Sequence, residues 1–363
     1  MSHFKVLFYF GGFAPTGGIE TFCKNLLVHL NANEYPCELV CWGKSSQLIK
    51  VIQEHKIKIN RSFWRWGCKW NLPDWFLLLI GFWSLKNSDV VFFGKLFPLP
   101  ILNILRSQAK SHTKFIYVTP YKPEVSSFIE AKKLSKSLNL FNLILVQSQC
   151  FIQALKESNY LGDIAVIPYI TAFKSQLLDL PPKTTLHIGF LGRLVPDKNI
   201  SLLLQAFKFL KKLNCNLNAK LNLFGDGSLR NQLESLANDL GIKDSVIFHG
   251  EVPHNQVSDV ISSCHLFVFT SINEGQCLAA LEILSCGRPI VATNAGALPE
   301  ILSDSRLGKL VEFTPESVAT GILEVAQLLE ESITPEDIRS AYLERFDPQK
   351  VGDRYIEIIN SLE

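Results

Sequence analysis

The sequence predicts an α/β protein with two units, each a parallel sheet covered by helices on both faces. Three observations carry this prediction. Short apolar runs alternate with helical patterns along the chain, a proline-containing segment interrupts them near the middle, and 363 residues suffice for two domains. Hydrophobic residues form 47% of the chain and charged residues 19%, which is typical of a globular protein rather than a disordered one.

The first unit is predicted over residues 1–172. A glycine-rich loop over residues 11–18 follows its first apolar run, and a helical pattern then covers residues 19–30. Its predicted strands are residues 4–9, 38–42, 90–93, 115–118, 143–146 and 165–167. Continuous apolar runs of this length are typical of strands that are buried on both faces of a parallel sheet.

The second unit is predicted over residues 173–345, after a linker over residues 173–185 that contains Pro181 and Pro182. Its predicted strands are residues 186–191, 219–224, 246–249, 266–269 and 290–292. A last helix is expected within residues 346–363. Ligands of such sheets bind beyond the carboxyl ends of the strands. Two units whose carboxyl ends face each other predict one ligand-binding cleft.

The net charge of +2 conceals an asymmetry, because residues 1–172 carry +9 and residues 173–363 carry −7. No nucleic-acid-binding motif accompanies the basic half, so we expect contact with an anionic membrane surface or a phosphorylated lipid, and no nucleic-acid partner. Residues 61–75 place four tryptophans among basic side chains, and Lys132, Lys133 and Lys136 add charge. Two interpretations of the tryptophans stay open: a membrane interface, or a protein core beside a solvated face.

The cysteines and apolar runs indicate where the protein works. Nine cysteines include no C-x-x-C pair, which favours free thiols in a reducing cytosol over a disulfide framework or a zinc site. The longest strongly apolar run, residues 75–85, is too short to span a bilayer, and we expect no signal peptide. The predicted location is the cytoplasm, with peripheral attachment to the inner face of the membrane as an option.

The most informative stretch is residues 271–282, where Glu274 and Glu282 stand eight positions apart across a predicted loop and helix start. The helix is expected over residues 278–285, with Gly287 ending it. Backbone N–H groups at residues 276–279 would then face an anion such as a phosphate. One carboxylate at the helix start and one two turns further on could hold hydroxyl groups on either side of that phosphate. A nucleotide sugar has this layout.

The pattern E-x7-E, continued by residues 287–302, resembles the signature of the retaining family 4 glycosyltransferases with the GT-B fold. The resemblance implies two Rossmann-like, doubly wound domains that face a cleft, with the last helix crossing back to the first domain. It also implies that Glu274 holds donor-sugar hydroxyls and Glu282 holds the ribose. The donor-binding residues that the resemblance implies are Gly17, Gly18, Arg193, Lys198, Glu274, Gly275, Gln276, Cys277, Leu278 and Glu282.

Arg193 and Lys198 lie on one predicted strand-to-helix connection, in the segment G-R-L-V-P-D-K-N, which resembles the phosphate-binding segment of the same family. Two cations there would neutralise a diphosphate leaving group where negative charge develops. The chain has no D-x-D motif for a divalent metal. We therefore expect metal-independent catalysis without a cofactor, in which Glu274, Arg193 and Lys198 are the catalytic residues.

The sequence departs from the family pattern in several places, and two of them concern the candidate site. Many members carry a histidine after the strand that corresponds to residues 115–118, where this chain has Thr119, Pro120 and Tyr121; His112 precedes that strand. Gln276 and Cys277 replace the more familiar Phe and Gly. These changes leave the first-domain catalytic residue and the donor sugar open.

The resemblance implies an enzyme that moves a hexose, from a UDP-sugar in the favoured case, to a hydroxyl of a glycan or a lipid-linked acceptor. The expected setting is surface polysaccharide or glycolipid synthesis. Two alternatives stay open on the same fold: a non-catalytic nucleotide-sugar-binding scaffold, and a nucleotide-sugar epimerase. A nicotinamide-dependent oxidoreductase is excluded because the dinucleotide fingerprint G-x-G-x-x-G is not met.

Overall fold

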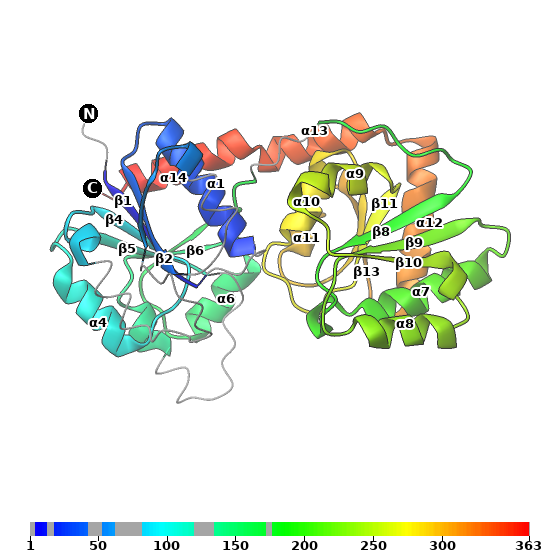
Figure 1. The fold of residues 1–363 in the computed structure, drawn as a ribbon, viewed down its shortest axis with the longest axis horizontal. Coiled ribbons are helices and arrows are strands. Elements are labelled where there is room, and N and C mark those ends of the chain that lie inside the picture. Colours follow the sequence, from blue (N-terminus) through cyan, green and yellow to red (C-terminus); the bar gives the residue numbers. More distant parts are fainter. Residues whose placement is uncertain are drawn as a thin grey trace. The chain divides into compact units, whose positions relative to one another are not determined.

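The computed structural model describes residues 4–12, 18–42, 53–61, 82–119, 134–171 and 176–362. The chain divides into two compact units (Figure 1). The first comprises Met1–Ala172 together with Pro348–Glu363, and the second comprises Phe173–Asp347. Each unit is a parallel sheet with helices, which confirms the predicted fold class.

The first unit holds a seven-stranded sheet in the order β3-β2-β1-β4-β5-β6-β7, with every neighbouring pair parallel. The strands are β1 (Val6–Gly12), β2 (Cys37–Trp42), β3 (Lys58–Arg61), β4 (Val90–Phe93), β5 (Lys114–Val118), β6 (Leu143–Val146) and β7 (Asp163–Val166). All four residues of β4 are buried, as the apolar run predicts for a central strand. The sequence analysis missed β3, an edge strand that reads Lys-Ile-Asn-Arg and has no apolar run.

The described helices of the first unit are α1 (Gly18–Ala32), α4 (Leu99–Gln108), α6 (Cys150–Glu157) and α14 (Pro348–Asn360), with shorter helical stretches at residues 82–86 and 134–138. The last helix, α14, packs against α1, and Figure 1 shows the two side by side. The Tyr355 ring lies 5.5 Å from that of Phe22, and its hydroxyl donates to the Pro168 carbonyl at 3.0 Å. His29 faces Asp353 at 3.2 Å. These contacts attach the end of the chain to the first unit.

The second unit holds a six-stranded parallel sheet in the order β10-β9-β8-β11-β12-β13. The strands are β8 (Leu186–Leu191), β9 (Ala219–Phe224), β10 (Val246–Gly250), β11 (Leu266–Phe269), β12 (Ile290–Thr293) and β13 (Gly308–Val311). The order reverses direction at β8 and β11, the topological switch point of a doubly wound sheet. The sequence analysis missed β13, an edge strand in which Lys309 and Leu310 are exposed.

The helices of the second unit are α7 (Ile200–Leu213), α8 (Arg230–Asp239), α9 (Val257–Ser262), α10 (Leu278–Ser285), α11 (Leu298–Ile301), α12 (Pro315–Glu331) and α13 (Pro335–Phe346). Figure 1 shows α7 and α8 on one side of this sheet and α10 and α11 on the other. Thr334 and Asp337 form a capping box at the start of α13, which satisfies backbone N–H groups there.

A row of polar side chains crosses the second sheet. The backbone N–H of His187 donates to His265 Nδ1 at 3.1 Å, Asn222 Nδ2 lies 3.5 Å from His187 Nδ1, and His249 Nε2 lies 3.1 Å from Asn222 Oδ1. Burial lowers the pKa of all three histidines, with help from the charge of Lys220 at His187 and of His187 at His265. The folded protein therefore holds these rings neutral.

This row predicts a loss of stability in mild acid. A histidine whose pKa is lower in the folded protein stabilises the fold fully above its unfolded pKa of about 6.5, and that contribution is lost as the pH falls through the folded pKa. Urea unfolding followed between pH 7.5 and 5 should show a falling free energy of unfolding. The double variant His187→Gln and His265→Gln should flatten this dependence, and an unchanged slope would contradict the assignment.

Among the described residues, no helix is both long and apolar enough to cross a membrane. The tryptophan-rich residues 62–75, together with Lys132 and Lys133, lie outside the described residues. Lys136 is described and is exposed in the helical residues 134–138. The choice between a membrane interface and a core for the tryptophans stays open.

Candidate active site

The candidate site lies at the carboxyl ends of β8 and β11, which are hydrogen-bonded neighbours. After β8, the chain runs through a short 3-10 helix (Pro196–Lys198) into α7; after β11, it runs through residues 270–277 into α10. Lys198 Nζ forms a short ion pair with Glu274 Oε1, and Ser271 Oγ donates to the same oxygen at 2.8 Å. Two residues that the sequence analysis assigned to the donor thus meet, 76 positions apart in the chain.

Backbone and hydroxyl contacts hold the two connections together. The Ile272 N–H donates to the Asp197 carbonyl at 2.9 Å, and Thr270 Oγ1 donates to the Lys198 carbonyl at 3.1 Å. From the next strand, Thr293 Oγ1 donates to the Ser271 carbonyl at 2.7 Å. Except for Thr293, which ends β12, these groups lie in the two short connections, so the Lys198–Glu274 pair is held by both of them.

The ion pair is largely removed from water, since the exposed fraction is 7% for the Glu274 side chain and 19% for that of Lys198. Burial alone would lower the pKa of Lys198, but the charge of Glu274 and the hydrogen bond to it outweigh burial and raise the pKa. Lys198 is therefore an ammonium group at neutral pH. A ligand phosphate that recruits it has to compete with Glu274.

Arg193 lies close enough to this pair for its positive charge to lower the pKa of Lys198. The residue is exposed, and its guanidinium has no hydrogen bond or ion pair with any residue that the structure describes. Its fork of donors is thus available to an anion beside Lys198. The predicted neighbourhood of Arg193, Lys198 and Glu274 is present within one unit.

Gly275, Gln276 and Cys277 form the entry to α10, with Leu278 as its first residue. Gln276 is buried, and the Gly275 carbonyl accepts from the Ala297 N–H at 3.1 Å. Cys277 has φ +56°, a left-handed conformation that favours glycine, the more familiar residue there. Burial, then the charge of Glu274, raises the pKa of the Cys277 thiol, so it stays protonated. This agrees with the interpretation that Cys277 is a poor nucleophile.

Glu282 lies on α10, eight residues beyond Glu274, and is half-buried. Burial raises the pKa of the Cys286 thiol to about 11, and the negative charge of Glu282 adds a smaller effect in the same direction. Glu282 therefore lies near Cys286, towards the end of α10. Its predicted role at the ribose stays a prediction.

Gly296 supports the site in a way that the sequence analysis did not identify, although the residue lies within the segment that carries the resemblance. It has φ +52°, and a Cβ atom there would lie 1.8 Å from the Glu274 carbonyl oxygen. Only glycine allows this approach. The sequence shows only a glycine a few residues after a predicted strand. It does not show that this glycine approaches the backbone of Glu274.

Gly296→Ala should therefore displace the Glu274 loop. We expect loss of donor binding together with a lower melting temperature, because a left-handed conformation and a backbone clash both penalise the alanine. Gly241→Ala is a matched control: its φ is +71°, but no heavy atom lies within 4 Å of the added Cβ. If both variants lost stability equally and both bound donor normally, the close approach to Glu274 would have no functional role.

In the first unit, Gly18 is the first residue of α1, whereas Gly17 lies outside the described residues. Thr119 is buried at the carboxyl end of β5, and Pro120 and Tyr121 are outside the described residues. His112 precedes β5 and faces Asp89, which precedes β4. It lies at the amino ends of the strands, so it does not replace the histidine that the family carries after the corresponding strand.

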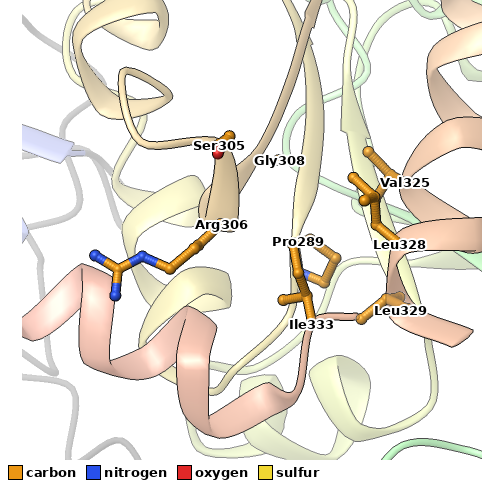
Figure 2. Close-up of a pocket in the computed structure, with 8 residues that line it drawn as sticks. All are labelled: Pro289, Ser305, Arg306, Gly308, Val325, Leu328, Leu329 and Ile333. Carbon is orange, nitrogen blue, oxygen red and sulfur yellow. The ribbon is translucent and has the colours of Figure 1, made fainter. Parts of the chain in front are cut away.

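An apolar pocket of about 10 Å³ occurs in the second unit (Figure 2). Figure 2 shows Val325 and Leu328 of α12 facing Pro289, which precedes β12. Arg306, at its margin, is paired with Asp304 at 2.6 Å and Glu344 at 3.0 Å. The pocket has room for about one water molecule. It lies at the amino ends of β12 and β13, so it is not part of the candidate site at the carboxyl ends.

Within the described ranges, no group of three or more His, Cys, Asp or Glu side chains is placed to hold a metal ion. The cations of the candidate site are Arg193 and Lys198. The expectation that the reaction needs neither metal nor cofactor stays a prediction.

Comparison with known proteins finds a family match in the second unit. Residues 179–345 match the family model of glycosyl transferases group 1. The chain is 29% identical over 198 residues to D-inositol 3-phosphate glycosyltransferase of Stackebrandtia nassauensis, covering 48% of this chain and 45% of that protein. It is 28% identical over 240 residues to O-antigen chain mannosyltransferase B of Escherichia coli, covering 62% of each. The chain therefore spans 45% and 62% of the length of these two relatives.

Solved structures resemble the whole chain. The Anabaena protein Alr3699/HepE in complex with UDP and glucose has a TM-score of 0.76 at 18% identity, covering 99% of this chain and 100% of that one. The lipopolysaccharide outer core galactosyltransferase WaaB has a TM-score of 0.71 at 18% identity, covering 97% and 99%. At this identity the likeness concerns the fold. The chain has the GT-B fold, and its residues 179–345 match the family model of glycosyl transferases group 1.

Proposed function

We propose that this protein is a retaining glycosyltransferase that moves a hexose from a nucleoside diphosphate sugar to a hydroxyl of a glycan or a lipid-linked acceptor. The observation that carries the proposal is the buried Lys198–Glu274 pair at the carboxyl ends of β8 and β11, with the guanidinium of Arg193 beside it. Cations for a diphosphate and a carboxylate for sugar hydroxyls occur together there. The group 1 family match over the same residues supports this assignment.

In the proposed reaction, the bond between the anomeric carbon and the diphosphate oxygen breaks, and a bond from that carbon to the acceptor oxygen forms on the same face. The acceptor proton passes to the leaving phosphate. Arg193 and Lys198 stabilise the charge that develops on the diphosphate, without a metal or a cofactor. Glu274 orients hydroxyls of the donor sugar, and Glu282 binds the ribose. A UDP-sugar is the favoured donor, because the similar Anabaena protein is described in complex with UDP and glucose.

The acceptor side of the proposal rests on charge and on the relatives. Residues 1–172 carry +9, which suits a phosphorylated or lipid-linked acceptor and peripheral contact with the inner face of a membrane from the cytoplasm. The similar proteins of Escherichia coli and Stackebrandtia nassauensis are named for the O-antigen chain and for D-inositol 3-phosphate. Surface polysaccharide or glycolipid synthesis is the setting that we propose.

Thermal shift measurements test the donor site. UDP, GDP and ADP, alone and as sugar conjugates, are added to the wild type and to Arg193→Ala and Glu282→Ala. A ligand that binds the folded state raises the melting temperature, by linkage. One nucleotide should stabilise the wild type, and both variants should lose the shift. If no nucleotide stabilised the wild type, the assignment of the donor site would be contradicted.

A further inference from the structure

A cavity of about 230 Å³ lies in the first unit, outside the candidate active site. It sits at the amino ends of β1, β4, β5 and β6, because four lining residues lie just before these strands or begin them: Phe4, Asp89, Lys114 and Asn142. It is lined by Phe4, Asp89, Arg106, Ser111, His112, Thr113, Lys114, Asn142 and Leu362. Pockets for drug-sized ligands usually measure about 300–1,000 Å³, so this one suits a small group.

Three of the lining side chains present free hydrogen-bond donors. Arg106 Nη1 donates to the Thr113 carbonyl at 2.8 Å, and its guanidinium lies 4.6 Å over the Phe115 ring. The other guanidinium N–H groups, the Lys114 ammonium and Asn142 Nδ2 have no partner among the residues that the structure describes. Asn142 is held in place through its oxygen, which accepts from the Phe115 N–H at 2.9 Å.

The carboxylate in the cavity, that of Asp89, already has hydrogen-bond and ion-pair partners within the protein. Asp89 accepts from the Lys5 N–H at 2.9 Å and faces His112 at 3.3 Å and Lys110 at 3.6 Å. Burial would raise the pKa of Asp89, but the contacts from Lys5, His112 and Lys110 outweigh it and lower the pKa, so the group is ionised. Arg106 and Lys114 in the lining, together with Lys110 beside Asp89, give three cations against this one carboxylate. The cavity thus combines a positive field with donors that lack acceptors.

We propose that this cavity binds a phosphate group. A guanidinium fork, an ammonium and an amide N–H from three different elements suit a compact anion with several acceptor oxygens. The phosphate group can be free or can belong to the headgroup of a lipid at the surface of this basic unit. The inference does not rest on the proposed function, since no residue of the cavity belongs to the donor site.

Two variants remove a positive charge or a hydrogen-bond donor with little disturbance. Lys114→Gln removes one charge, and Asn142→Asp replaces the Nδ2 donor with an oxygen while keeping an acceptor for the Phe115 N–H. Lys156→Gln in α6 is the matched control, because Lys156 lies outside the cavity and is exposed. Arg193→Ala removes a cation of the donor site, so it separates phosphate bound at that site from phosphate bound in the cavity. Melting temperatures check that each variant is folded.

Binding is measured in two arms with the whole 363-residue chain. Calorimetry follows inorganic phosphate, and sedimentation follows phosphatidylcholine vesicles with and without phosphatidic acid. Lys114→Gln and Asn142→Asp should each weaken binding about tenfold or more, the usual effect of losing a hydrogen bond to a charged group. Lys156→Gln should bind as the wild type does, and Arg193→Ala should retain the phosphate binding that the cavity variants weaken.

The arms separate the two sources. Binding of inorganic phosphate that the cavity variants weaken supports a free anion, and binding to phosphatidic acid vesicles alone, weakened in the same way, supports a lipid headgroup. Absence of binding in both arms overturns the proposal. Binding that the folded cavity variants leave unchanged also overturns it. Nucleotide should still raise the melting temperature of the three variants other than Arg193→Ala. Failure of the cavity proposal is therefore distinct from failure of the proposed function.

Discussion

Lys198→Met and Glu274→Gln should each lower the rate of sugar transfer by about 10²–10³, the usual effect of removing one group that stabilises developing charge. Both side chains are largely buried and contact each other directly. Loss of Lys198 removes a cation from the leaving diphosphate, and loss of the Glu274 charge removes both a sugar contact and the partner of Lys198. The measurement is kcat with a saturating nucleotide-sugar donor.

Lys208→Met is the matched control, because Lys208 is exposed on α7 in the same unit and should leave the rate unchanged. The double variant of Lys198 and Glu274 should be scarcely slower than the slower single variant, since the two residues act as a unit. Single variants that transfer sugar at the wild-type rate would show that the pair is structural.

Arg288→Met should destabilise the second unit strongly. Arg288 is 0% exposed, and its guanidinium donates to backbone carbonyls of Cys264 at 2.9 Å and Leu178 at 2.8 Å and, in a short contact, of Asp179. Methionine preserves much of the volume but leaves these buried carbonyls without donors. At about 1–3 kcal/mol for each unsatisfied group, we expect a loss of roughly 3–5 kcal/mol.

The loss is measured as the free energy of unfolding in urea, with nucleotide absent. Arg230→Met is the control, because Arg230 forms exposed pairs with Asp226 and Glu234 within the same unit and such pairs add little. Arg288 ties residues 178 and 179 to the end of α9 and the start of β12. Equal stability of the two variants would mean that water satisfies these carbonyls equally well.

The sequence predicted the central strands well but missed two of the four edge strands, β3 and β13. Strands such as β4 are buried on both faces and read as apolar runs, whereas β3 and β13 lie at sheet edges and carry exposed Lys58 or Lys309 and Leu310. Hydrophobic pattern alone does not separate an exposed edge strand from a loop. The fold class was therefore predictable, but the number of strands was not.

The sequence predicted which residues belong to the candidate site, but it did not predict which of them contact each other. Spacing and family resemblance selected Lys198 and Glu274, but their direct pairing depends on β8 lying beside β11, a sheet order that spacing along the chain does not encode. The positive φ of Cys277 and the approach of Gly296 to Glu274 are also products of tertiary packing. The sequence could name these residues, but the reason for their identity needed the fold.

The most direct test of the central claim is release of nucleoside diphosphate from a nucleotide sugar by the purified protein. UDP-glucose, GDP-mannose and ADP-glucose are each incubated with the wild type and with Lys198→Met, Glu274→Gln and Lys208→Met. We predict release above the protein-free rate for one donor by the wild type and Lys208→Met, and its loss in the other two. Release that is equal in all four proteins, or absent with every donor, would contradict the assignment of the donor site.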